Sequence, residues 1–107
     1  MAVNGYVVCY VTVPTREEAE SISRMLLDKK LVACVNRVGP VQSLYWWQGH
    51  VDKADEYLLI MKSIEEKKEE IVEAVRLVHS YEVPEILFLP IIAGHEAYLS
   101  WIGDSLK

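Results

Sequence analysis

Apolar and amphipathic stretches alternate along the 107-residue chain. The apolar stretches are rich in β-branched and aromatic residues, as strands are. They cover residues 6–13, 31–35, 41–47, 57–61 and 84–92. The second and third belong to one kinked strand, because Gly39-Pro40 lies between them and proline cannot donate a ladder hydrogen bond. The pattern therefore predicts four strands, with a bulge or bend at Pro40.

The stretch from Leu31 to Ser63 is predicted to form one long hairpin. Gln48-Gly49-His50 supplies the turn between its arms. Trp46 and Trp47 stand next to each other just before this turn, and neighbouring side chains of a strand point to opposite faces. Both tryptophans cannot enter the core of one subunit, so one of them is expected to dock on a neighbour.

Helix-starting signals precede the amphipathic stretches. Thr15 with a glutamate three residues later is a capping box, which predicts a helix beginning at Arg16. Ser63 stands at the same spacing from Glu66, which predicts a second helix with an apolar inward side. A short third helix is predicted from residue 95 to residue 102.

The order of these elements predicts the fold class. Two strand–helix–strand units in tandem, joined by a tight hairpin, are typical of the ferredoxin-like split βαβ arrangement. We therefore predict an α+β, ferredoxin-like split βαβ sandwich, β-α-β-β-α-β plus a short C-terminal helix. It forms a single domain over residues 1–107, with the strands in the order four-one-three-two.

The predicted strands are apolar on both faces. Both main helices of this fold lie on one side of the sheet, so a sheet that met water on the other side would alternate apolar and polar residues. Tyr6, Val8 and Tyr10 instead alternate with other apolar residues. The short C-terminal helix reaches only about 15 Å and cannot cover such a face. Self-association is the expected cover.

Composition narrows the function classes. Sixteen acidic residues outnumber eleven basic ones, giving a formal charge of −5, so nucleic acid is not an expected partner. No stretch has the pattern of a signal peptide or a membrane span, so a cytoplasmic protein without a membrane partner is predicted. Cys9 and Cys34 lack metal-type spacing and are interpreted as reduced thiols, with a disulfide as the alternative.

Two groups of residues could carry chemistry. His79, Glu82 and Glu85 offer an imidazole and two carboxylates within seven residues, and Cys34 offers a thiol that suits copper. The alternative for His79 is structural, at the end of a helix. Glu85 follows a proline inside an apolar run, where an ionised carboxylate needs a partner such as Lys62 or Tyr81. A structural ion pair at a subunit interface and a small-ligand cleft both stay open.

Several motifs together resemble one family, the CutA proteins named for divalent-cation tolerance. In chain order they are Ala33-Cys34-Val35-Asn36, Ser43-Leu44-Tyr45-Trp46-Trp47-Gln48-Gly49, Glu56 with Lys62, His79-Ser80-Tyr81-Glu82-Val83-Pro84-Glu85, Pro90-Ile91 and Tyr98-Leu99-Ser100-Trp101. The resemblance implies a ferredoxin-like subunit in a tight homotrimer similar to PII signalling proteins. It also implies a role in tolerance of copper and other divalent metals, with no established enzymatic reaction. The family's favoured copper ligands are a first-strand cysteine and the histidine that matches His79.

These arguments predict a metal site and an intersubunit cleft. The candidate metal ligands are His79, Cys34 and Glu85. The cleft residues are Asn36, Ser43, Tyr45, Trp47, Glu56, Lys62, Tyr81, Glu85, Tyr98 and Trp101. A metal-responsive binding protein is the first interpretation, with no required cofactor and copper or another divalent metal as candidate ligand. A PII-like sensor of a small anionic ligand is the second. An enzyme is not expected, because no nucleophile triad, phosphate loop or spaced carboxylate pair occurs.

Overall fold

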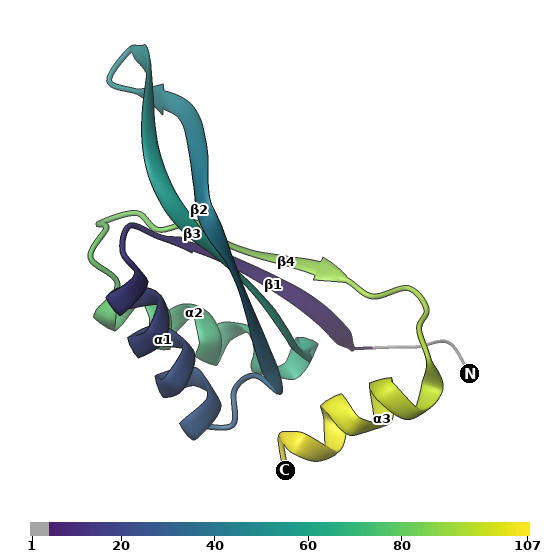
Figure 1. Cartoon of the computed structure of the whole chain (residues 1–107). Coiled ribbons are helices and arrows are strands. Elements are labelled where there is room, and N and C mark those ends of the chain that lie inside the picture. The colour runs from purple at the N-terminus through teal and green to yellow at the C-terminus, as the bar shows by residue number, and fades with distance from the viewer. Residues whose placement is uncertain (1–4) are drawn as a thin grey trace.

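The computed structural model describes residues 5–107, which form a four-stranded antiparallel sheet and three α-helices (Figure 1). The elements are β1 (Tyr6–Val13), α1 (Arg16–Asp28), β2 (Cys34–Trp47), β3 (His50–Ile64), α2 (Lys68–Val78), β4 (Ile86–Pro90) and α3 (Glu96–Ser105). The strand order is β2-β3-β1-β4, which confirms the predicted order. The fold is the predicted ferredoxin-like α+β arrangement.

Helices α1 and α2 cover one face of the sheet and enclose the main core (Figure 1). Cys9 and Val11 of β1 and Leu59 and Met61 of β3 are fully buried there against Ile22 of α1 and their neighbours. Helix α1 begins where the sequence predicts, because the hydroxyl oxygen of Thr15 accepts a hydrogen bond from the backbone N–H of Glu18 at 3.1 Å.

The prediction of a second capping box at Ser63 is wrong. Ser63 pairs with Val7 inside the β1–β3 ladder, and its buried hydroxyl donates to the backbone oxygen of Leu31 at 2.6 Å. The chain then makes a 3₁₀ turn over Glu65–Lys67, and α2 starts only at Lys68 without a side-chain cap. Strand pairing holds Ser63 extended, so its hydroxyl cannot cap the helix.

Several strand boundaries also differ from the prediction; the return strand predicted over residues 57–61, for example, is β3 and extends over His50–Ile64. Leu31 and Val32 are buried in the core but precede β2, which starts at Cys34 and runs on without a break to Trp47. Glu85 precedes β4, which is shorter than predicted and extends only over Ile86–Pro90. At the hairpin tip, Trp47 already pairs with His50, so the turn has two residues rather than three.

A bulge interrupts the hairpin at the predicted place. Val38 pairs with Leu58 and Val41 pairs with Glu56. Between these two pairs, β2 therefore advances by three residues and β3 by only two. One extra residue exchanges the faces of all later side chains in β2. Gly39 has a φ of +144°, and a Cβ built there would lie 3.0 Å from the backbone oxygen of Glu56.

The sheet face opposite α1 and α2, which we call the open face, is covered at one end only. Helix α3 packs Leu99, Ile102 and Leu106 against that end in a second small cluster. Beyond it, Leu87 and Leu89 of β4 stay 52% and 42% exposed. The prediction that the short C-terminal helix cannot cover this face is confirmed.

Replacing Gly39 with alanine should destabilise the fold more than the same change at Gly49. Both glycines have positive φ, but a Cβ at Gly49 meets nothing within 4 Å, whereas one at Gly39 meets backbone. We expect a loss of about 1 kcal/mol for Gly49→Ala and about 2–3 kcal/mol for Gly39→Ala, measured by urea unfolding at fixed protein concentration. Equal losses would contradict the close approach at the bulge.

Candidate functional site

The bulge places the predicted cleft residues of the two hairpin strands on one surface. Before the bulge, Asn36 pairs with Ile60 and shares the open face with Lys62. After the bulge, the odd-numbered residues of β2 take that side. Ser43, Tyr45 and Trp47 therefore lie on the same face as Asn36, Lys62 and Glu56. This open face is the candidate functional surface.

A first cluster lies where α3 meets the open face. The ammonium of Lys62 donates to the side-chain oxygen of Asn36. The Cys34 sulfur and the Tyr98 hydroxyl lie 3.7 Å apart, and this hydrogen bond raises the pKa of Tyr98. The rings of Tyr98 and Trp101 stack with centroids 5.5 Å apart. Five predicted site residues therefore come together from β2, β3 and α3.

A second cluster lies toward the hairpin, around the loop after α2. The Tyr81 hydroxyl donates to a carboxylate oxygen of Glu56 at 2.7 Å, and Glu56 is only 7% exposed. Burial, together with this bond to a carboxylate, raises the pKa of Tyr81 well above its usual range. The bond fixes the loop that precedes β4 to the strand that continues into the hairpin.

His79 is part of the same cluster, and both of its ring nitrogens are engaged. Nε2 lies 2.7 Å from the backbone oxygen of Thr12, so it donates there, and Nδ1 accepts from the backbone N–H of Tyr81 at 3.0 Å. A carboxylate oxygen of Glu18 lies 3.4 Å from Nδ1 and accepts from the backbone N–H of Ser80 at 2.9 Å. These bonds favour the structural interpretation of the histidine, because neither nitrogen is left free for a metal.

The buried carboxylate of the site is Glu56 and not Glu85, the residue predicted for that place. Glu85 is exposed and lies outside the strand, so it has no need of a partner. Its two predicted partners bond elsewhere, Lys62 to Asn36 and Tyr81 to Glu56. The sequence does carry a signal that Glu56 is the buried carboxylate: it directly precedes the apolar run 57–61. An acidic residue at the start of a buried strand requires a hydrogen-bond donor.

The three candidate metal ligands do not form a site within one chain. Cys34 pairs with Lys62, which lies beside Val8 of β1, whereas His79 bonds Thr12, four residues further along β1. Four residues of strand separate these positions by about 13 Å. Among residues 5–107, no three His, Cys, Asp or Glu side chains are placed to hold a metal ion together.

The two cysteines are free in this structure. Strand β3 lies between β1, which carries Cys9, and β2, which carries Cys34. Burial raises the pKa of the Cys9 thiol to about 12, so this thiol stays protonated and unreactive at neutral pH. Cys34 is half-buried and is the accessible thiol.

The fold and these motifs define a class of small ferredoxin-like proteins. Residues 7–105 match the sequence profile of the CutA1 divalent ion tolerance protein family. The chain belongs to this family, which confirms the resemblance inferred from its motifs. No helix of the described residues is long and apolar enough to cross a membrane.

Individual relatives agree with this assignment. The divalent-cation tolerance protein CutA of Archaeoglobus fulgidus is 42% identical over 98 residues, which cover 92% of this chain and 95% of the relative. Its counterpart from Thermus thermophilus is 40% identical over the same length, with the same coverage of both chains. The crystal structure of CutA1 from Oryza sativa superposes with a TM-score of 0.94 at 39% identity, covering 97% of this chain and 95% of that one.

Proposed function

We propose that this protein acts in divalent-cation tolerance as a homotrimer that binds its ligand, rather than as a catalyst, and that the binding site lies in the cleft between subunits. The observation that carries the proposal is the set of residues gathered at the open face. Eight of the ten predicted cleft residues lie on the hairpin strands or on α3, and a ninth, Tyr81, donates a hydrogen bond to one of the eight, Glu56. Residues 5–107 leave most of that face uncovered.

The trimer is supported by the edges of the sheet as well as by the open face. Strands β2 and β4 stand at opposite edges of the sheet, and each has one side that no other described strand pairs with. Pairing of β2 from one copy with β4 of the next is a heterologous contact, which closes a ring when the rotation permits. The family resemblance supplies the number three. We propose that the open faces lie toward one another in this ring.

Metal binding is proposed at Cys34 and in the cleft. Cys34 is the accessible thiol, and thiolate is a ligand that suits Cu(I). Residues 5–107 of one chain hold no group of three such ligands, so further ligands for copper would come from a neighbouring subunit or from solvent. We therefore propose weak copper binding at the surface of each subunit, completed or strengthened in the assembly.

A small anionic ligand is the second candidate, because of Lys62. Among the described strands, Lys62 is the only cation on the open face; Arg37 and Lys53 point to the other side. If assembly of the trimer buries the ammonium of Lys62, this charge requires a negative charge nearby. An anion in the cleft could supply it, as in the PII-like sensor interpretation.

A cytoplasmic location remains part of the proposal. The Archaeoglobus fulgidus structure, with a TM-score of 0.92 and 40% identity over 95% of this chain and 99% of that one, is described as that of a periplasmic protein. Fractionation of cells that express the native coding sequence would decide between the two compartments for this chain.

The trimer is tested by sedimentation over a dilution series. We expect a wild-type trimer at micromolar concentration, and partial or complete dissociation for Leu87→Asp, because this side chain is 52% exposed on the open face. Leu77→Asp is the matched control, since Leu77 is 77% exposed on the helix side. A folded wild-type species of 12.3 kDa would refute the proposal.

Copper binding is tested by anaerobic competition titration with Cu(I). We expect Cys34→Ala to weaken binding at least about tenfold, because it removes the accessible thiolate ligand. Cys9→Ala should bind as the wild type does, since Cys9 is fully buried and protonated. His79→Ala should also leave the affinity unchanged while lowering thermal stability. Unchanged affinity in Cys34→Ala would overturn the assignment.

The anion alternative is tested by thermal shift with inorganic phosphate, carboxylates and adenine nucleotides. If an anion binds in the cleft, it should raise the Tm of the wild type and of Lys62→Arg but not of Lys62→Ala. Lys68→Ala, on the surface of α2, is the control and should respond as the wild type does. A stabilising anion whose effect survives Lys62→Ala would exclude this site.

A further inference from the structure

A groove of about 430 Å³ lies between α1 and α2, on the face of the sheet that these two helices cover (Figure 1). We call it the α1–α2 groove. Met25 and Leu31 line it on the side of α1, and Leu77 and Val78 line it on the side of α2. Leu77 and Val78 are 77% and 52% exposed, so the described part of the chain leaves much of this apolar lining uncovered.

The α2 wall of the groove has the spacing of a helix-packing surface. Five residues form it at the helical positions i, i+3, i+4, i+7 and i+8: Glu70, Glu73, Ala74, Leu77 and Val78. This stripe is separate from Ile71 and Val75, which the same helix buries in the core. Ala74 is the smallest residue of the wall, so its larger neighbours leave a hollow above it. Such a hollow receives a large apolar side chain when a further helix packs against the first.

The charges of the groove are mostly negative. Glu70 and Glu73 stand on the α2 wall, and Lys29, directly after α1, is the one cation among the lining residues. Glu73 lies 3.9 Å from Arg76, whereas Glu70 has no ion-pair partner within 4 Å among residues 5–107. The whole chain also carries a formal charge of −5. A basic occupant is therefore electrostatically complementary to this groove.

We propose that the α1–α2 groove binds a basic amphipathic helix of a partner protein. The apolar side of that helix lies against Ala74 and Leu77, and a lysine or arginine of its flank lies beside Glu70. The partner helix covers the second stripe of α2 in the way that the sheet covers the first. The inference goes beyond the proposed function, because it requires neither copper nor an anion in the cleft.

The shape of the groove favours a helix over other occupants. An extended peptide binds by adding a strand to a free sheet edge, and the lining of this groove consists of the two helices and the turn after α1. A small ligand needs a site that buries most of its surface, whereas Leu77 and Val78 are mostly exposed. An amphipathic helix in a groove needs apolar anchors at helical spacing, which this wall accommodates.

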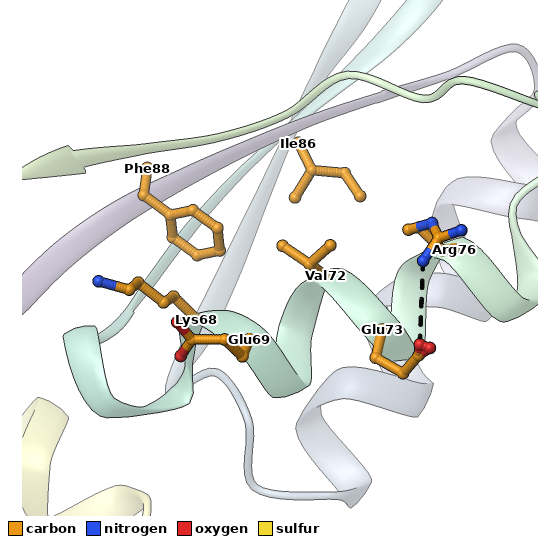
Figure 2. A pocket seen from close by; sticks show the side chains of 7 residues that line it. All are labelled: Lys68, Glu69, Val72, Glu73, Arg76, Ile86 and Phe88. Atoms are coloured by element: carbon orange, nitrogen blue, oxygen red, sulfur yellow. Dashed lines mark ion pairs between the residues drawn. The ribbon is translucent and has the colours of Figure 1, made fainter.

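A second groove, of about 440 Å³, lies on the other side of α2 and serves as the internal comparison. Figure 2 shows Ile86 and Phe88 pointing from β4 toward Val72 of α2 in this groove. It borders β4, an edge strand whose free side the proposed trimer uses. Glu69 lines this second groove and Glu70 lines the α1–α2 groove, so these adjacent glutamates form a matched pair for mutation.

Binding is tested with a designed helical probe. The probe is a fluorescein-labelled peptide of about 15 residues with leucines at helical spacing, lysines on both flanks and glutamines elsewhere. We expect the wild-type protein to raise its fluorescence anisotropy with a Kd of about 10–100 µM. A peptide of the same composition in scrambled order, which has no apolar side, should bind at least about tenfold more weakly. A probe that stays free at about 1 mM wild-type protein would overturn the proposal.

Two pairs of variants locate the binding. Leu77→Gln should weaken binding of the probe about tenfold, because it removes an apolar anchor. Leu27→Gln should have no effect, since Leu27 is an exposed leucine of α1 outside the groove lining. Glu70→Lys should weaken binding about fivefold, whereas Glu69→Lys, with the same change in net charge, should not. Equal effects within either pair would contradict binding in this groove.

Photo-cross-linking identifies the native occupant. A benzophenone amino acid replaces Leu77, or Leu27 in the control, and the protein is irradiated in an extract of its own cells with and without the probe. We expect an adduct only from position 77, which the probe suppresses. Mass spectrometry should place it in a segment of another protein that is basic and has apolar residues at helical spacing. An adduct with a second copy of this chain, an adduct with a segment of another kind, or no adduct that the probe suppresses would overturn the proposal.

The outcomes separate this inference from the proposed function, because the α1–α2 groove lies within one chain. A wild-type monomer that binds the probe would refute the trimer and leave the groove assignment intact. A wild-type trimer that binds copper but not the probe would overturn only the groove assignment.

Discussion

One extra residue in β2 is the constraint on which the candidate site depends. Because strand side chains alternate, the bulge between Val38 and Val41 exchanges the two sides of the arm. Without it, Tyr45 and Trp47 would point to the helix side, and the predicted cleft residues would be divided between two surfaces. Gly39 permits the bulge, because the chain passes so close to Glu56 that a Cβ has no room.

The second cluster gives His79 a structural role within the chain. A buried imidazole needs hydrogen-bond partners, and His79 has them on both nitrogens, from Thr12 and from the Tyr81 backbone. Tyr81 in turn bonds to Glu56. These hydrogen bonds connect the loop after α2 to β1 and β3, and this loop leads into β4. The donors and acceptors of His79 and Tyr81 are therefore used to hold the loop in place.

The unequal covering of the sheet connects the fold to the proposed assembly. Two helices bury one face, whereas α3 covers only an end of the other, and both edge strands have a free side. For a lone subunit, an apolar face and free edges favour aggregation. The proposed closed ring would cover these features, because edges would pair with edges and open faces with open faces.

The sequence alone determined the strand and helix order, the bulge at Pro40, the α1 cap and the family, because these depend on local pattern and on motifs. Only the tertiary structure decided that Ser63 pairs in a strand instead of capping α2, and that Glu56 rather than Glu85 is the buried carboxylate. Both outcomes depend on partners far away in the sequence. Leu31 accepts from Ser63, and Tyr81 donates to Glu56 across the molecule. Local spacing carries no information about such partners, because folding brings them together.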